Sequence, residues 1–223
     1  MFKKIYIFYN LYLKYKIYLK KKTYSQYKED LFVIKFFKNK KKGFYVDVGC
    51  NHPSRINNTF LLYNLGWRGV NIDMSKFCID LFNIARKEDQ NFNFAVSNTN
   101  KLITYYTNKD LFLSASIMKN KESSKFKHKN KVQSKKLTDI LDSSKFKQKQ
   151  IDFLNIDAEG ADFLVLKSLN FKIYKPKLIC VEIWGQETRN GIKKSKIYKF
   201  LYKKKYKLIH YTPDNYFFSL KNY

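Results

Sequence analysis

The fold is decided by residues 42–53, which read Lys42-Gly43-Phe44-Tyr45-Val46-Asp47-Val48-Gly49-Cys50-Asn51-His52-Pro53. The first half is a short apolar run rich in β-branched and aromatic side chains, which is typical of a strand buried in a parallel sheet. The run breaks where an acid, a glycine and an amide follow one another. Ligands bind at this carboxyl end of the strands in open α/β sheets. Gly49 permits either a positive φ or a close approach of the backbone to a ligand.

A second acid, Asp73, ends the next apolar run, Gly69-Val70-Asn71-Ile72-Asp73-Met74. At the end of a neighbouring strand its carboxylate can accept both hydroxyls of a ribose. The glycine fingerprint of a dinucleotide site is absent, because Gly49 stands alone. A ribose-binding acid without a phosphate cradle favours a nucleoside cofactor that lacks phosphates, namely S-adenosylmethionine. The alternative is that Asp47 and Asp73 only cap loops.

The composition predicts a globular chain with one full-sized domain, since 44% of its 223 residues are hydrophobic. A net charge of +27 ordinarily indicates nucleic acid or an anionic membrane as partner. Lys, Asn, Ile, Phe and Tyr are all abundant together, however, while Arg, Ala, Gly and Pro are scarce, which is the bias of an AT-rich genome. We therefore expect most lysines to be solvated surface and nucleic acid not to be a partner.

Three cysteines, Cys50, Cys78 and Cys180, lie far apart, without metal-ligand or CxxC spacing. An odd number of cysteines without a framework is typical of a reducing, cytoplasmic compartment.

Residues 1–22 are set apart by lysines on both sides of the apolar run Ile5 to Leu13. The run is too short to span a bilayer, and no small-residue cleavage site follows it. A basic aromatic helix of this kind either lies on an anionic membrane surface, at the inner face of the membrane, or packs on the domain or a partner subunit. We expect it to serve attachment and to be dispensable for catalysis, with residues 23–223 forming the domain.

The rest of the chain alternates strand and helix, the rhythm of a parallel sheet covered by helices. Helices are expected after the cap Ser25, from Asn57 to a stop at Gly66, and after the cap Ser75. Further helices are expected at 137–141, after 160 and near 193–204, and further strands at 68–73, 92–96, 102–106, 151–156, 176–183, 207–211 and 216–219. Residues 107–136, a lysine-rich tract with Ser114, Ala115, Ser116 and His128, predict a mobile flap on the substrate side.

A second acidic segment predicts the chemistry. The strand Ile151 to Ile156 ends in Asp157-Ala158-Glu159-Gly160, next to the crevice formed by Gly49. Alternation along an extended strand would place both carboxylates on one side, where repulsion raises one pKa toward that of a base. Glu182 and His52 are candidate helpers, and Asp157 and Glu182 are the candidate ligands if Mg²⁺ is bound. The alternative is that Glu159 only caps the following helix and Asp157 only holds the amino group of the cofactor.

These segments together resemble the FkbM family of S-adenosylmethionine-dependent methyltransferases. The resemblance is carried by Gly43 to Pro53, Leu65 to Asp73 and Asp152 to Gly160, and by Ser25 to Asp30 and Asp214 to Phe218 at the two ends. It covers about residues 24–219 in the family's order and spacing. Cys50 stands where the family often has Ala, and Asp73-Met74 where Glu-Pro is common.

The resemblance implies a single-domain α/β fold, a Rossmann-like seven-stranded class I methyltransferase sheet flanked by helices. It also implies methyl transfer to a hydroxyl, typically of a sugar, so the acceptor is expected to be a small molecule or a glycan. The cofactor is expected to bind through residues from the ends of the first three strands: Asp47, Gly49, Cys50, Asn51, Asp73, Met74, Ala95 and Val96. Two rival interpretations remain, an RNA methyltransferase and a non-catalytic binding module.

Overall fold

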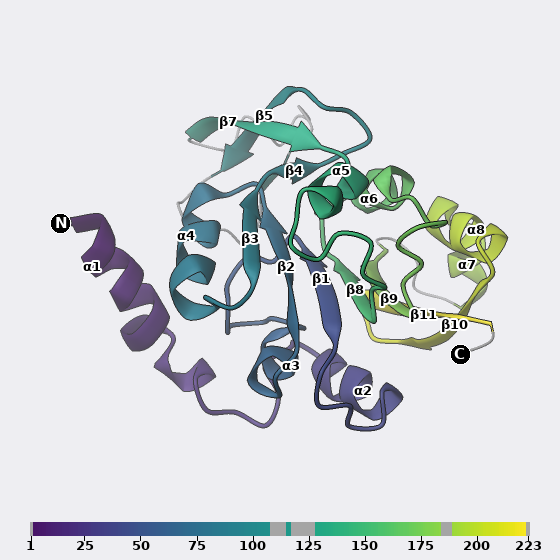
Figure 1. Ribbon diagram of the computed structural model, residues 1–223, viewed down its shortest axis with the longest axis horizontal. Helices are drawn as coiled ribbons and strands as arrows, with labels where there is room; N and C mark the ends of the chain where they lie inside the picture. The colour runs from purple at the N-terminus through teal and green to yellow at the C-terminus, as the bar shows by residue number, and fades with distance from the viewer. Residues whose placement is uncertain (1, 108–114, 117–127, 184–188, 222–223) are drawn as a thin grey trace.

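A seven-stranded mixed sheet forms the centre of the molecule (Figure 1). The computed structural model describes residues 2–107, 115–116, 128–183 and 189–221. Across the sheet the strand order is β10-β11-β9-β8-β1-β2-β3. The strands are β1 (Phe44–Val48), β2 (Arg68–Asp73), β3 (Gln90–Asn93), β8 (Phe153–Ile156), β9 (Leu178–Glu182), β10 (Tyr206–Tyr211) and β11 (Asn215–Leu220). The five strands from β9 to β3 are parallel, and β11 enters antiparallel between β9 and β10.

Helices cover both faces of this sheet because side chains alternate along each strand. From β1, Phe44, Val46 and Val48 belong to the larger core, whereas Tyr45 faces the opposite side. The larger core lies under α5 (Leu137–Asp142), α6 (Asp162–Ser168) and α8 (Lys196–Lys203), and the smaller under α2 (Glu29–Phe36) and α3 (Phe60–Asn64). The helix α4 (Lys76–Ala85) contacts β2 and β3, and α7 (Arg189–Ile192) precedes α8. The predicted Rossmann-like class I methyltransferase architecture is thereby confirmed.

Two sequence predictions about this sheet need correction. The expected strand 92–96 is split, since β3 ends at Asn93 and Ala95–Val96 form β4, which pairs with β7 (His128–Lys135) in a second sheet. Ser25 does not cap a helix, because α2 begins at Glu29 after Lys28 in a left-handed conformation. The Asp30 carboxylate instead accepts the Ser25 hydroxyl at 2.8 Å and holds that segment in a turn.

The second sheet lies over one end of the first, at the top of Figure 1, in the order β4-β7-β5-β6. It contains β5 (Leu102–Thr107), which confirms the expected short strand, and β6 (Ala115–Ser116). The predicted flap 107–136 is wrong for residues 128–135, of which 128–133 pair antiparallel with β5 and 134–135 pair parallel with β4. Its remaining residues, 108–114 with Ser114 and 117–127, lie outside the described residues.

The N-terminal segment packs on the domain along one side. It contains α1 (Phe2–Phe8), a π-helical turn (Tyr9–Lys14) and a 3₁₀ turn (Lys16–Tyr18). Ile7 and Leu11 are buried against Leu81 of α4. Of the two predicted placements, packing on the domain therefore holds for this buried face. Across the described residues, no helix has the length and hydropathy needed to cross a bilayer.

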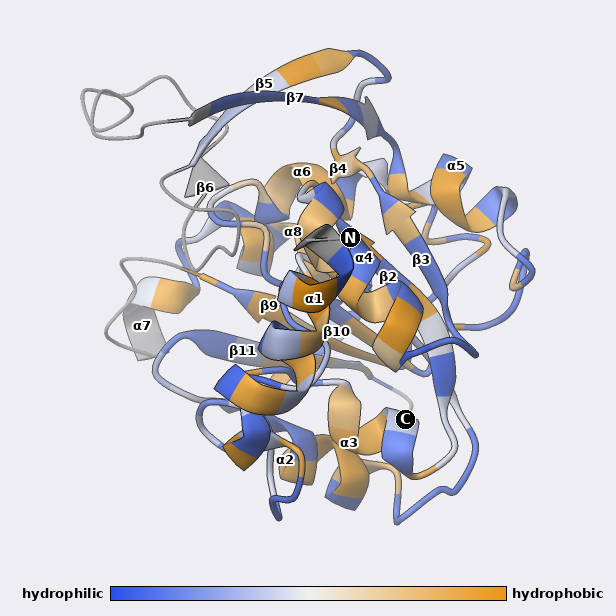
Figure 2. Cartoon of the chain, turned by 90° about the vertical axis from the view of Figure 1, so that its left-hand side faces the viewer, coloured by the Kyte–Doolittle hydropathy of each residue, from blue (hydrophilic) through white to orange (hydrophobic). Residues whose placement is uncertain are grey.

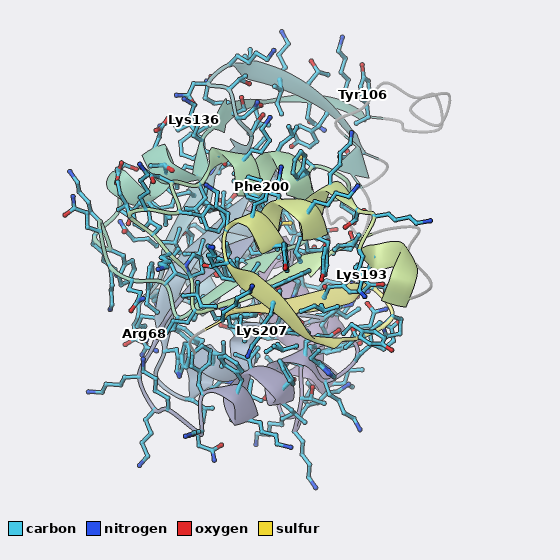
Figure 3. The ribbon with its side chains drawn as sticks, turned by 90° about the vertical axis from the view of Figure 1, so that its right-hand side faces the viewer. Arg68, Tyr106, Lys136, Lys193, Phe200 and Lys207 are labelled. Atoms are coloured by element: carbon cyan, nitrogen blue, oxygen red, sulfur yellow. The ribbon has the colours of Figure 1, made fainter. Side chains whose placement is uncertain are left out.

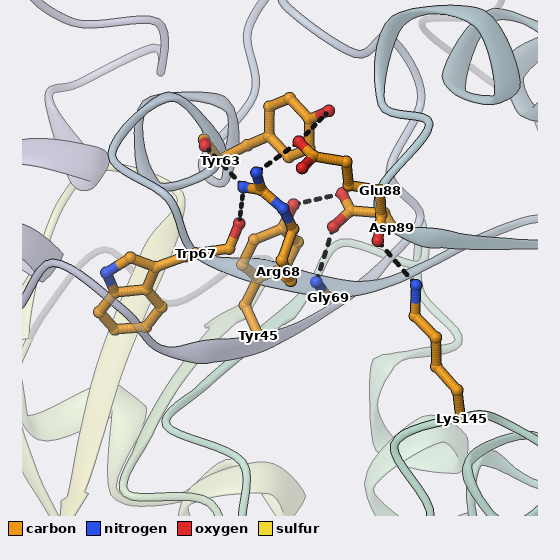
Figure 4. Close-up of polar contacts among 8 residues, drawn as sticks. All are labelled: Tyr45, Tyr63, Trp67, Arg68, Gly69, Glu88, Asp89 and Lys145. Atoms are coloured by element: carbon orange, nitrogen blue, oxygen red, sulfur yellow. Dashed lines mark hydrogen bonds and ion pairs between the residues drawn. The ribbon is translucent and has the colours of Figure 1, made fainter.

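Two buried carboxylates fix the strands at the opposite end from the second sheet. Asp89 accepts the Gly69 amide at 2.7 Å and the Tyr45 hydroxyl, which joins β1 and β2 to the start of β3 (Figure 4). Its neighbour Glu88 forms an exposed ion pair with Arg68 in the same figure.

The other carboxylate, Asp152, precedes β8 and forms ion pairs with Lys177 at 2.8 Å and Lys40 at 3.0 Å. It also accepts the Phe44 amide at 3.0 Å. Burial alone would raise the pKa of Asp152, but the bonds from Lys177, the Phe44 amide and Lys40 outweigh it, so the pKa is lowered from its usual 3.8.

We predict that Asp152→Asn lowers the free energy of unfolding by about 2 kcal/mol, the scale of hydrogen bonds to charged groups. Because the pKa of Asp152 is lowered, its stabilising effect is complete above the ordinary pKa of an aspartate. It is lost as the pH falls through the lowered value. Denaturant unfolding at several pH values measures this difference. Glu88→Gln, which removes an exposed ion pair, is the control and should change nothing measurable. Equal losses in the two variants would contradict the role given to Asp152.

Candidate functional site

A pocket opens where the carboxyl ends of β1, β2 and β8 meet the second sheet, and its volume is about 710 Å³ including the space open to solvent. Eight of the twelve predicted site residues line it: Gly49, Asn51, Asp73, Met74, Ala95, Val96, Asp157 and Glu159. The structure thus brings together residues that are separated by more than 100 positions in the sequence.

Gly49 is required at the floor of the pocket for two reasons. Its φ is +78°, which side chains with a Cβ rarely adopt. A Cβ built there would lie 1.8 Å from the carbonyl oxygen of Asp157. The predicted positive φ is therefore confirmed, and the close approach is to the backbone after β8. This contact sets the loops after β1 and β8 against each other.

Asp73 presents its carboxylate to the pocket from the end of β2. One oxygen accepts the Ser75 amide at 2.7 Å and the other accepts the Asn51 amide at 2.9 Å. The second acceptor position of each oxygen is left for a ligand. Desolvation raises the pKa of Asp73 to about 6, although the two amides act in the opposite direction. Such a carboxylate is suited to accept hydroxyl donors above that pH.

Asp157 and Glu159 lie in a loop and not on an extended strand, because β8 ends at Ile156 and Glu159 has a φ of +49°. The expected strand alternation therefore does not explain their common position. The loop is held by Asp162 of α6, whose carboxylate accepts the amides of Ala158 at 2.9 Å and Gly160 at 3.1 Å. The turn so formed directs both acids to the pocket.

The pKa of Asp157 is raised well above its usual 3.8. Asp157 is exposed at the pocket, and the protein packed around it still desolvates its carboxyl, which is the largest cause of the shift in pKa. The negative charges of Glu182 and Glu159 act in the same direction. The pKa of Glu159 is raised as well, by desolvation and then by Asp162. The predicted mutual repulsion of acids is therefore present, and it is strongest at Asp157.

Asp47 lies beneath the pocket and does not line it. Its side chain points to the same face as that of Tyr45, two residues earlier. One oxygen accepts the Asn155 amide group at 2.9 Å, and the other accepts the Thr59 hydroxyl at 2.7 Å. Both oxygens are therefore used inside the protein, and Asp47 supports the pocket from below.

Three further predicted residues, Cys50, Glu182 and His52, also lie outside the lining. Cys50 is buried against Ile79 and Phe82, and burial raises its pKa, so the thiol stays protonated. Glu182 ends β9 and acts on the pocket through the pKa of Asp157.

His52 faces the N-terminal segment, with its ring 5.2 Å from that of Tyr15. Its Nδ1 accepts the amides of Ser54 at 3.2 Å and Arg55 at 3.1 Å. Burial and the charge of Arg55 lower the pKa of His52 to about 4, so the imidazole is neutral at physiological pH.

A metal site is not found in the described part of the chain, where no three His, Cys, Asp or Glu side chains are grouped to hold an ion. The alternative in which Asp157 and Glu182 share Mg²⁺ is therefore without support in the geometry.

The pocket also contains residues that sequence reasoning missed, chiefly Cys78 of α4, Phe94 between the two sheets, and Tyr105 of β5. Tyr105 is 7% exposed and burial raises its pKa, so it presents a neutral hydroxyl. Its position depends on the pairing of β5 with β7, which no local sequence pattern predicts. The alternation in Leu102 to Tyr106 was the available signal.

Comparison with protein families matches residues 47–208 to the methyltransferase FkbM domain, which is more than half of the chain. Comparison with the curated proteins gives no match.

Among solved structures, a TehB-like SAM-dependent methyltransferase from Corynebacterium glutamicum is 9% identical, over 99% of this chain and 98% of that one, with a TM-score of 0.47. A proposed RNA methyltransferase from Pyrococcus horikoshii is 12% identical, over 91% of each chain, with a TM-score of 0.44. A proposed type 11 methyltransferase from Sulfolobus solfataricus is 12% identical, over 88% of this chain and 91% of that one, with a TM-score of 0.41. Likenesses at these scores carry no conclusion about the reaction.

The family match, the ordered motifs and the pocket in which they meet lead to one conclusion, that this chain belongs to the FkbM methyltransferase family.

Proposed function

We propose that the protein uses S-adenosylmethionine to methylate a hydroxyl group, most simply that of a sugar in a glycan or a similar small metabolite. The observation that supports this most is the placement of Asp157, an acid with a raised pKa, in the same pocket as the ribose-type acid Asp73. One acid is suited to hold the cofactor and the other to take a proton.

The described residues fit this cofactor. Asp73 offers free acceptor positions for the two hydroxyls of a ribose, and Asn51 and Gly49 border the same space. Ile72 and Phe94 supply an apolar surface beside them, of the kind that receives a flat base. Ala95 and Val96 continue this surface, in agreement with the expected position of the adenine.

When bound, S-adenosylmethionine supplies a methyl group on a positively charged sulfur. A hydroxyl is a poor nucleophile until its proton is removed. Asp157 can accept that proton at a carboxylate oxygen, and its raised pKa brings it closer to the operating pH. Glu159, beside it in the loop, can orient the acceptor by accepting a further hydroxyl. Holding the two reactants in line supplies much of the remaining rate.

The charge at the pocket favours a neutral acceptor over RNA. Asp157 and Glu159 line the pocket, and the charges of Glu182 and Asp162 act on Asp157 from outside the lining. This group of acids would repel a phosphate backbone. Three exposed lysines in Figure 3, by contrast, project from separate elements: Lys136 before α5, Lys193 after α7 and Lys207 of β10. An RNA-binding surface would need a basic stripe leading to the pocket.

We predict that Asp73→Ala weakens S-adenosylmethionine binding by about 1–3 kcal/mol, the range for lost hydrogen bonds to a charged group. In the parent protein the affinity should fall as the pH drops through about 6, because the protonated carboxyl of Asp73 loses acceptor capacity. In Asp73→Asn this fall should be reduced, since the group no longer titrates. Calorimetric titration across this pH range measures both effects, with Asp139→Asn as a control away from the pocket. Unchanged affinity in Asp73→Ala would remove Asp73 from the cofactor site.

We predict that Asp157→Asn lowers kcat by about 10²–10⁴-fold, the usual contribution of a general base, and leaves cofactor affinity unchanged. Glu159→Gln should raise KM for the acceptor more than it lowers kcat. Removing the negative charge in Glu182→Gln should lower the pKa of Asp157 and move the acid limb of the pH–rate profile to lower pH. Candidate sugar acceptors are first tested by mass spectrometry for an added methyl group.

A chelator added to the parent enzyme separates the base from a metal-dependent alternative, in which Asp157 would hold Mg²⁺ with Glu182. The proposed base role requires full activity in the chelator. Full activity of both Asp157→Asn and Glu159→Gln would contradict the catalytic assignment.

A further inference from the structure

The outer side of the N-terminal segment carries an unusual concentration of exposed apolar side chains. Seven of the 18 large hydrophobic residues that are exposed in the described part of the chain fall within residues 5–17. They are Ile5, Tyr6, Phe8, Tyr9, Tyr12, Leu13 and Ile17. Ile17 is 69% exposed, and Ile5 and Leu13 are each 58% exposed, which leaves most of their surface in water. Clusters of this kind mark interaction sites.

Apart from Tyr6, whose ring lies 5.3 Å from that of Phe77 in α4, the exposed residues form one face. Ile7 and Leu11, four residues apart, are buried against α4. Ile5 and Phe8 of α1 and Tyr12 of the following π-helical turn, spaced three and four apart, are exposed and lie away from this buried side. The rings of Phe8 and Tyr12 lie 5.0 Å apart on this side. Figure 2 shows α1 on the outside of the molecule, in front of the sheet, with hydrophobic residues (orange) along its ribbon.

Every charged side chain in residues 1–28 is a lysine. Lys14, Lys16 and the run 20–22 follow the apolar face directly, and all are exposed. The Lys21 ammonium lies 4.2 Å from the ring centroid of Tyr18, so the basic and aromatic groups share one surface. The segment, called here the basic–aromatic face (residues 4–22), thus combines apolar, aromatic and cationic groups.

We propose that the basic–aromatic face docks the protein on the surface of an anionic lipid bilayer. An apolar stripe bordered by lysines and aromatic rings is the composition with which helices bind in the interface plane. Anionic headgroups attract the lysines, while the exposed apolar side chains enter the boundary with the acyl chains. A second copy of this chain is a poorer occupant. Pairing two such faces would bring together two segments whose charged side chains are all positive, and these would repel each other.

Docking at this face would bring the bilayer close to elements that border the pocket. Tyr15 contacts His52 through its ring and lies 4.6 Å from the Arg55 guanidinium, both in the loop that follows β1. The helix α4, which receives Ile7 and Leu11, carries the pocket residue Cys78. A bilayer bound here therefore lies on the same side as the loop and helix that shape the cofactor end of the pocket.

The test uses the full chain and point variants, since removing the segment would expose Leu81 of α4. We expect the protein to co-sediment with phosphatidylcholine vesicles that contain about 30% phosphatidylglycerol, and much less with phosphatidylcholine alone, because the lysines need negative headgroups. Phe8→Ser, Leu13→Ser and Ile17→Ser together should weaken partitioning by about tenfold or more, because the buried apolar area is lost. Reversing Lys20, Lys21 and Lys22 to Glu should have an effect of similar size.

The control replaces three exposed apolar residues elsewhere, Leu65→Ser, Ile173→Ser and Ile209→Ser, which are 37–45% exposed, and should bind vesicles like the parent. Thermal unfolding verifies that all three triple variants are folded. Three outcomes would overturn the proposal: no binding of the parent protein to anionic vesicles, equal binding to both vesicle types, or equal loss in the control variant. None of them depends on methyltransferase activity.

Discussion

The buried carboxylate of Asp47 is the constraint on which the site depends. It is 1% exposed and accepts hydrogen bonds from Asn155 of β8 and from Asn57 and Thr59 before α3. Desolvation raises the pKa of Asp47, and the bonds from Asn155 and Thr59 act against this and favour the charged form. A buried carboxylate without such partners would be strongly unfavourable. The two central strands and the loop after β1 are therefore joined through one side chain.

Arg86, which is also fully buried, extends this network from the end of α4. It donates to Thr59 at 2.7 Å, to Asn57 at 2.6 Å and to the carbonyl of Pro53. With Asp47 it fixes the loop 50–59, whose Asn51 amide is in turn bound by Asp73. Gly49 lies above this network. A Cβ at this position would come within 1.8 Å of the Asp157 carbonyl oxygen, so only glycine lets the loops after β1 and β8 meet. The pocket acids are thus placed by buried polar groups beneath them.

The sequence predicted those parts of the fold whose signals are local. The apolar run to Val48, the acid Asp73 at the end of the next strand, and the Asp157 loop could all be placed at the carboxyl edge of one sheet from their order alone. Asp47 was assigned to the cofactor because it stands beside Gly49. Its inward role could not be predicted, since it depends on Asn155 and Arg86, which are distant in the sequence.

The same reason explains what was missed at the pocket wall. Tyr105 reaches the pocket because β5 pairs with β7. A long, lysine-rich stretch of sequence separates these two strands, so their pairing has no local signal. The strand expected at 92–96 read as continuous because hydrophobic alternation does not reveal a change of sheet at Phe94. His52 was predicted to be a catalytic candidate because it follows Gly49 closely in the sequence. The sequence did not indicate that Tyr15 packs against its ring on the side of the N-terminal segment.

The central claim is that the pocket between Asp73 and Asp157 holds the cofactor, and a crystal structure of the protein with S-adenosylhomocysteine tests it most directly. The account predicts electron density in this pocket, with the ribose hydroxyls donating to Asp73, the base beside Phe94 and Val96, and the sulfur turned toward Asp157. Density for the ligand at another place in the molecule, with this pocket filled by solvent, would contradict it.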